Sequence, residues 1–325
     1  MKLKDVQRLE LPPSADMHVH LRQGEGYRSW NWWFLKSPNL QPPITSVASA
    51  IEYQSRLKSI EPNVKYLMSL YLHPSVTPEV IAEAAAAGVT GVKMYPQGVT
   101  TNSDSGAPAD FLEAYSSVFA TMEQHDLVLN LHGEVPGDLP SNNVSREEAF
   151  LPELKRLHEK FPRLRCILEA RDMSEVDPLA FCKPIPQTPR DRDALMKAAS
   201  SGDSKFFFGS DSAPHPLASK SHQPVPAGVF TQPFATQLVI LALEEAIERG
   251  VIDEHEVTQE RLENFLSRSG RRFYKLPEPS AEGQPKIVLE RKGDTIPVSI
   301  KSADGTTEIG LSRPTAPIFS LSWLS

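Results

Sequence analysis

Five side chains in this sequence have the types and positions that a metal site needs. His18 and His20 lie two residues apart in the run DMHVH. Alternate residues of a strand point to the same face, so both imidazoles can reach one metal ion. Lys93, His132 and Asp211 each end a short apolar run, in GVKMY, LNLHGE and FFGSDSAPH. Burial of a lone ammonium is costly, so a lysine at such a place needs a carboxylate partner or a chemical change. Together the five residues predict a metal centre with ligands suited to zinc.

Apolar runs that alternate with amphipathic helical patterns must position these residues. Strands are expected at 16–21, 64–72, 89–95, 127–132, 164–169 and 205–210, and helices at 47–60, 78–87, 111–125, 146–160, 189–200 and 233–249. This alternation predicts an α/β fold with a parallel sheet, and polar residues at the strand ends are typical of the catalytic rim of a TIM-like (β/α)8 barrel.

The strand count is about one short of a closed barrel. Only one helix fits between residues 169 and 205, and the strand expected before Pro38 is a tryptophan-rich run, RSWNWWFLK. A βαβ crossover needs roughly 30 residues, which the short stretch from Glu169 to the FCKP connector at 181–184 does not provide. We therefore expect a barrel over residues 1–276 that lacks or distorts one βα unit. A small β extension over residues 277–325 is expected to pack on the barrel.

Composition excludes several classes of function. The chain has 325 residues, a net charge of −7 and a pI near 5.8, with no basic run that would bind nucleic acid or an anionic membrane. No stretch reaches about 18 apolar residues, and charges interrupt the N-terminus, so a cytoplasmic protein is expected. Its two cysteines, Cys166 and Cys182, form no CxxC pair. A small molecule is the expected partner.

The motifs DMHVHLRQG, SPNLQPPITS, GVKMYPQGVTTNSDSG, LNLHGE, FFGSDSAPH and AGVFTQPFA occur in an order that resembles the dihydroorotase family. The similarity is to the monofunctional class of that family, within the amidohydrolase superfamily of metal-dependent barrels. It implies a two-zinc hydrolase that reversibly cyclises N-carbamoyl-L-aspartate to (S)-dihydroorotate in de novo pyrimidine synthesis. It also favours a homodimer.

The resemblance assigns roles to individual residues. It implies that His18, His20 and Asp211 hold one zinc, that Lys93 bridges both metals as N6-carboxylysine, and that His132 binds the second zinc. Two metals would lower the pKa of a bridging water, and Asp211 would move the proton to or from the leaving nitrogen. The substrate contacts implied in this way are Arg22, Asn39, Thr100, Thr101, Ala213, His215, Ala227 and Gly228.

One ligand of the family is missing. The position of a further zinc-binding histidine is Ala170, and the chain then goes almost at once from Glu169 to the FCKP connector, as if a segment were deleted. Glu169 and Asp172 are poor substitutes, because strand alternation aims Glu169 at the opposite face and Asp172 lies past the strand. We therefore expect nearer one zinc than two per chain.

Two alternatives stay open. The chain could be a catalytically impaired or inactive variant of the family. It could also be another cyclic amidohydrolase of the hydantoinase or allantoinase type, although the Arg22 and Asn39 clamp for an α-carboxylate argues against that.

Overall fold

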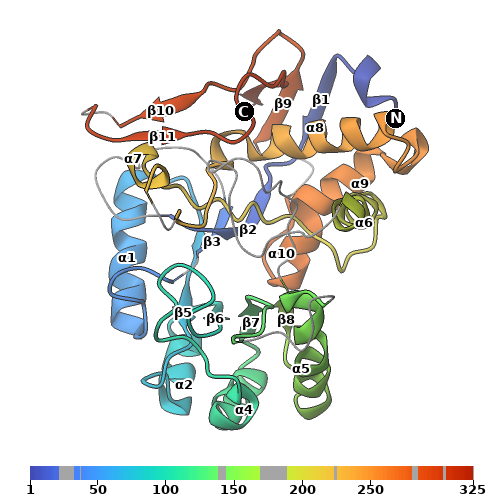
Figure 1. Ribbon diagram of the computed structural model, residues 1–325. Coiled ribbons are helices and arrows are strands. Elements are labelled where there is room, and N and C mark those ends of the chain that lie inside the picture. The colour runs from blue at the N-terminus through green and yellow to red at the C-terminus, as the bar shows by residue number, and fades with distance from the viewer. Residues whose placement is uncertain are drawn as a thin grey trace.

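Seven parallel segments form the centre of the protein. The computed structural model describes residues 1–21, 33–36, 38–137, 144–168, 189–222, 225–279, 285–302 and 305–324 (Figure 1). One parallel sheet holds β2 (Ala15–Val19), β3 (Trp33–Lys36) and β4 (Tyr66–Leu67), and another holds β5 (Ser69–Tyr71), β6 (Gly91–Met94), β7 (Val128–Leu131) and β8 (Cys166–Leu168). Only Met68 separates β4 from β5, so the two sheets form one continuous series. The tryptophan-rich run does supply a strand, because β3 pairs with both β2 and β4.

Most helices begin and end where local signals place them. Among the described helices, four have a side-chain cap at the first turn: α1 (Val47–Ile60) after Ser46, α2 (Pro78–Ala86) after Thr77, α5 (Arg146–Lys160) after Ser145 and α9 (Gln259–Glu263) after Thr258. The helix expected over 111–125 is broken at Tyr115 (φ −113°, ψ 19°) into α3 (Phe111–Ala114) and α4 (Ser116–Gln124). The remaining helices are α6 (Pro189–Ser200), α7 (Leu217–Lys220), α8 (Ala235–Glu248) and α10 (Ser269–Phe273), with a π-helical turn at Asn264–Arg268 and 3-10 turns at Leu3–Asp5, Gln232–Phe234 and Glu254–Glu256.

The segment expected as a strand at 205–210 runs beside β2 but is not a regular strand. The Met17 amide donates to the Phe208 carbonyl at 3.1 Å, and the Asp211 amide donates to the His18 carbonyl at 2.8 Å. Further along, the His20 amide donates to the Ser212 carbonyl at 2.8 Å. The Phe208 amide also donates to the Phe265 carbonyl at 3.0 Å, and the Ala213 amide donates to the Val229 carbonyl at 2.7 Å. A strand inside a parallel sheet is paired on both sides, and among the described residues no regular strand pairs with this segment on the side away from β2.

A cleft of about 1440 Å³ lies beside this segment. Its walls include β8, residues 205–210, and apolar side chains of α6 and α8. Within the described part of the chain, β8 pairs with β7 alone. The cleft lies between β8 and the segment 205–210, where the sequence predicts that one βα unit is lacking or distorted.

The C-terminal part forms a β layer that the N-terminus completes. Strand β9 (Lys286–Glu290) lies between β1 (Arg8–Leu11) and β12 (Ser320–Leu324), antiparallel to both, and β10 (Ser299–Lys301) pairs with β11 (Glu308–Gly310). Figure 1 shows α8 between this layer and the barrel strands. Leu9 and Leu289 of the layer share a buried cluster with Ile240 and Leu243 of α8. The sequence did not predict the part that β1 plays.

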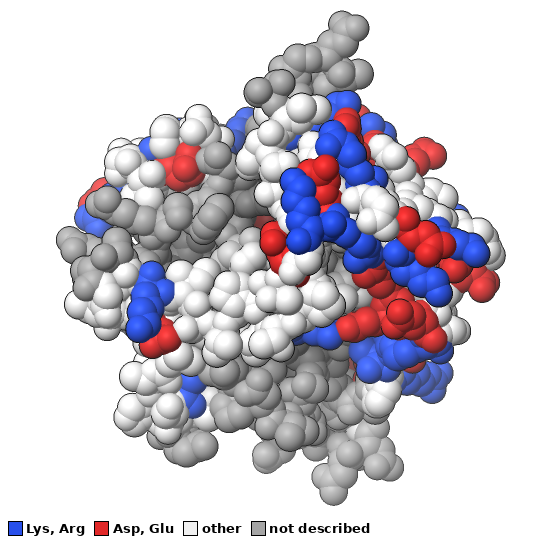
Figure 2. Space-filling model, turned by 90° about the horizontal axis from the view of Figure 1, so that it is seen from above, with Lys and Arg blue, Asp and Glu red and all other residues white. Residues whose placement is uncertain are grey.

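The surface carries charges of both signs. In Figure 2, Lys and Arg side chains lie interspersed with Asp and Glu on the face seen from above. Several are paired, for example Arg249 with Asp193 at 2.8 Å. Among the residues that the structure describes, no helix combines the length and hydrophobicity needed to cross a membrane.

Candidate metal and substrate site

Two histidines and an aspartate meet where β2 ends beside the segment 205–212. The Nε2 atoms of His18 and His20 lie 3.4 and 3.0 Å from Oδ1 of Asp211. Tetrahedral zinc with bonds of about 2.0–2.1 Å holds its ligand atoms about 3.3 Å apart. The three ligand atoms lie within 4.8 Å of one another, so the group has the spacing of a shared metal ion.

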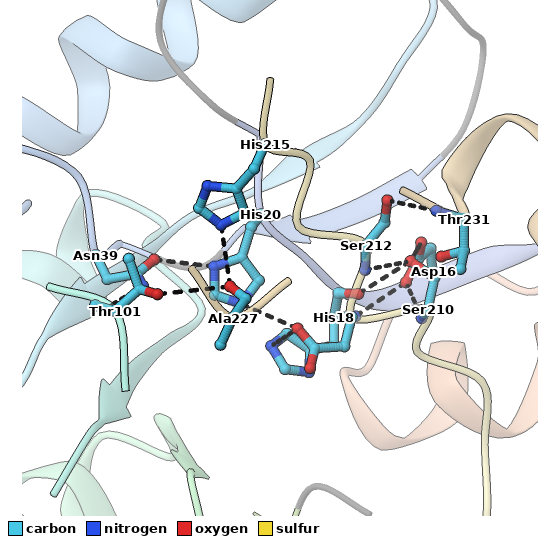
Figure 3. A network of polar contacts seen from close by, with 11 residues as sticks. Asp16, His18, His20, Asn39, Thr101, Ser210, Ser212, His215, Ala227 and Thr231 are labelled. Carbon is cyan, nitrogen blue, oxygen red and sulfur yellow. Dashed lines mark hydrogen bonds and ion pairs between the residues drawn. The ribbon is translucent and has the colours of Figure 1, made fainter. Parts of the chain in front are cut away.

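A buried carboxylate holds the two arms of this group together. Oδ1 of Asp16 accepts from the amides of His18 at 3.1 Å and Ser210 at 2.8 Å, while Oδ2 accepts from the Ser210 hydroxyl at 2.6 Å (Figure 3). Burial raises the pKa of Asp16 to about 7, although its hydrogen bonds with Ser210 and His18 oppose the rise. Asp211, the residue after Ser210, has φ +44°, a left-handed conformation that aspartate tolerates better than most residues. The carboxylate thus fixes the backbone on both sides of the metal-binding group.

Lys93 of β6 is buried deep in the barrel, with 2% of its surface exposed. Burial lowers the pKa of this ammonium to about 7, and the negative charge of Asp211 only partly opposes the change. A lysine with that pKa is in large part a neutral amine at neutral pH. Neutral amine is the form that can add CO₂. The Nζ atom lies 5.0 Å from the centre of the Tyr95 ring, which in turn lies beside His132.

His132 follows β7 and has a carboxylate partner that sequence reasoning missed. Its Nε2 lies 2.5 Å from Oε2 of Glu134, and both side chains are buried. Glu134 belongs to the LNLHGE motif, so a carboxylate two residues after a candidate ligand was the available signal. Asp16 was missed in the same way, two residues before His18.

Polar contacts connect the metal-binding group to the predicted substrate residues. His20 Nδ1 lies 2.9 Å from Asn39 Oδ1, and the side-chain Nδ2 of Asn39 donates to the Thr101 carbonyl at 3.2 Å. The Thr101 hydroxyl donates to the Ala227 carbonyl at 3.5 Å, and His215 Nε2 lies 3.0 Å from that same oxygen. Figure 3 shows this series of contacts from His20 to His215. The structure therefore brings Asn39, Thr101, Ala227 and His215 together beside the candidate metal group.

The other predicted contacts pack around the same place. Gly228 has φ +144°, and a Cβ there would lie 2.3 Å from the Ala213 carbonyl oxygen and 3.0 Å from the His215 ring. Only glycine fits this position without a shift of the backbone. The Thr100 amide donates to the Ser103 hydroxyl at 2.9 Å, which closes the turn that presents Thr101. Arg22, Glu169, Ala170 and Asp172 lie outside the described residues.

No protein-family model matches the chain. A Schizosaccharomyces pombe protein named "Probable dihydroorotase" is 40% identical over 90% of this chain and 94% of its own length. A Saccharomyces cerevisiae protein named dihydroorotase is 35% identical over 98% of this chain and 99% of its own.

The chain belongs to the dihydroorotase family.

The crystal structure of the S. cerevisiae dihydroorotase in complex with 5-fluoroorotic acid superposes with a TM-score of 0.85 at 34% identity, covering 98% of this chain and 99% of that one. This confirms the predicted amidohydrolase barrel.

The alignments also support an internal deletion relative to other dihydroorotases. The S. pombe match runs over 332 positions, whereas 90% of 325 residues is about 293, so about 39 positions of that match face gaps in this chain. The S. cerevisiae match runs over 373 positions against about 318 residues of this chain, which leaves about 55. Shortening of this size is what loss of a βα unit would produce.

Proposed function

We propose that this chain catalyses the dihydroorotase reaction, the reversible cyclisation of N-carbamoyl-L-aspartate to (S)-dihydroorotate in pyrimidine synthesis. The observation that carries the proposal is the group His18, His20 and Asp211, whose ligand atoms have metal-sharing distances. His215 and Ala227 lie within a few polar contacts of that group. Membership of the family supplies the substrate.

In this proposal, His18, His20 and Asp211 hold one zinc ion, and His132 with Lys93 as a carboxylated lysine would hold a second. The donor set fits, because imidazole nitrogens and carboxylate oxygens are ordinary zinc ligands. Bound zinc would supply Lewis acidity, which lowers the pKa of water and polarises the amide carbonyl. Carboxylation would also turn the buried ammonium of Lys93 into an anionic oxygen ligand.

The side chains then have separate tasks. In cyclisation, the terminal carbamoyl nitrogen forms a bond to the side-chain carboxyl carbon and one water leaves. Asp211 accepts the proton from that nitrogen, and it returns the proton to the leaving nitrogen in hydrolysis. Asn39 and His215, with Arg22, bind the α-carboxylate that stays outside the reaction, since charge-assisted hydrogen bonds suit a carboxylate. The turn with Thr100 and Thr101 covers the substrate, while Ala213, Ala227 and Gly228 form the wall.

A second candidate is an impaired member of the family that binds one zinc tightly and turns over slowly. Ala170 in place of a histidine and the cleft beside β8 favour it, because they remove a ligand and a wall from the second metal site. We place either form in the cytosol, as a possible homodimer, on the strength of composition and family resemblance.

The test is zinc content by elemental analysis together with carbamoyl-aspartate cyclisation by recombinant protein. Activity that disappears in Asp211→Ala supports the first candidate. One zinc per chain with slow turnover supports the second. Turnover of hydantoin or allantoin in place of carbamoyl aspartate would contradict both.

A further inference from the structure

The short hydrogen bond between His132 and Glu134 determines which nitrogen of His132 carries the proton, and this bears on the second metal site. This inference rests on the proposed role of His132 as a metal ligand. The two side chains are 3% and 6% exposed, and His132 Nε2 lies 2.5 Å from Glu134 Oε2. Two atoms that share a tetrahedral zinc ion would be about 3.3 Å apart, as the His18, His20 and Asp211 atoms nearly are. The separation in the His132 pair is that of a strong hydrogen bond instead.

The local backbone holds the two side chains in this relation. The Glu134 amide donates to the His132 carbonyl at 3.1 Å, which closes a three-residue turn. Its central residue is Gly133, where a Cβ would lie 2.1 Å from the Leu168 Cδ1 atom of β8. Glycine therefore lets β8 pack against the turn.

A hydrogen bond of this kind selects one form of the imidazole. A carboxylate only accepts, so Nε2 must carry the proton and Nδ1 is the nitrogen with a lone pair. We propose that Glu134 is a positioning residue that holds His132 in the Nε2–H form and turns Nδ1 into the metal-binding atom. Loss of such an outer partner of a metal-binding histidine commonly costs 10–100-fold in metal affinity. The effect matters here because Ala170 supplies no second imidazole.

The primary test reads the tautomer directly and needs no metal. Nitrogen-15 histidine NMR of the metal-free protein, with His132 assigned from the spectrum of His132→Gln, distinguishes the protonated from the bare ring nitrogen. We expect the Nε2–H form in wild type and in Glu134→Gln, whose carbonyl oxygen still accepts. Glu134→Ala should lose the preference, giving a mixture of both forms. Glu147→Gln is the matched control, because Glu147 is an acid on α5 that lies close enough to feel the charge of Glu134, yet no described hydrogen bond joins it to His132.

A zinc titration followed by the same His132 signals gives the second readout. We expect zinc to shift Nδ1 in wild type and to require at least ten times more zinc in Glu134→Ala. A wild-type ring in the Nδ1–H form, or an unchanged tautomer in Glu134→Ala, would overturn the inference. An Nε2–H ring that zinc leaves unshifted would support the hydrogen bond while contradicting the proposed second metal site.

Discussion

At Asp16, substitutions can distinguish the effect of lost hydrogen bonds from the effect of a lost negative charge. Its carboxylate accepts three hydrogen bonds, from the amides of His18 and Ser210 and from the Ser210 hydroxyl. Asp16→Ala leaves two buried amides without an acceptor, at about 1–3 kcal/mol each, so a loss of about 2–6 kcal/mol of unfolding free energy is expected. Asp16→Asn keeps both amide bonds through Oδ1, and its NH₂ group can donate to the Ser210 hydroxyl. Because burial raises the Asp16 pKa to about 7, the neutral amide also avoids burying a charge.

The assay pairs urea unfolding with competition for zinc against a chelator. Asp16→Asn should keep wild-type stability within about 1 kcal/mol and bind zinc with similar affinity. Asp16→Ala should be less stable and bind zinc at least ten times more weakly, since the backbone beside His18 and Asp211 is released. Ser210→Ala, which removes only the hydroxyl bond, should lie between them at about 0.5–1.5 kcal/mol. Equal stability and equal zinc affinity of the alanine and asparagine variants would refute the role of these hydrogen bonds.

Three further results are expected. Burial, with the nearby charges of Glu134, Asp191 and Glu148, raises the pKa of Glu147 to about 7, so the folded state keeps a proton that the unfolded state loses above about 4.5. The free energy of unfolding should therefore fall as pH rises from 4.5 to 7. In urea unfolding, Glu147→Gln should be more stable than wild type by about 1–2 kcal/mol at pH 8 and equally stable at pH 4. An equal gain at both pH values would exclude this cause. Gly228→Ala should raise KM by tenfold or more with a smaller effect on kcat in steady-state kinetics, because its Cβ displaces Ala213 or His215; an unchanged KM would mean that this wall does not touch substrate. A graft of the extra segment of the S. pombe relative between Leu168 and Pro189 should raise the midpoint temperature of unfolding and bring the zinc content from near one to near two per chain. A graft that changes neither would show that the cleft is not the place of the lost unit.

The sequence predicts best what is decided locally. The bounds of α1 and α5 follow from their serine caps and from a helical apolar period, α6 begins at Pro189, and the structure has all three helices at the predicted residues. His18 and His20 could be paired from strand alternation alone, since two residues in a strand always share a face. Lys93 and His132 were found because a charged or polar residue at the end of a buried apolar run is unusual in itself.

What the sequence did not predict depends on contacts between distant residues. Strand β1 pairs with β9 through residues almost 280 positions apart, and nothing within either strand specifies that partner. The segment 205–210 has the composition of a buried strand, yet it lacks regular strand geometry, and among the described residues only β2 runs beside it as a strand. Glu134 and Asp16 look like ordinary charged residues until the fold buries them against a histidine and a serine.

Loss of a βα unit after β8 would affect the two proposed metal sites unequally. Asp211 follows the segment 205–210, which has backbone bonds to β2 and contacts with Asp16, so the first ligand set is held from the β2 side. His132 depends on β7 and on the turn that β8 covers, and β8 is the strand that borders the cleft. The family resemblance places a further histidine ligand at the position of Ala170, two residues after the end of β8. A chain shortened here should therefore keep the first metal at near full affinity and lose the second first as free zinc is lowered.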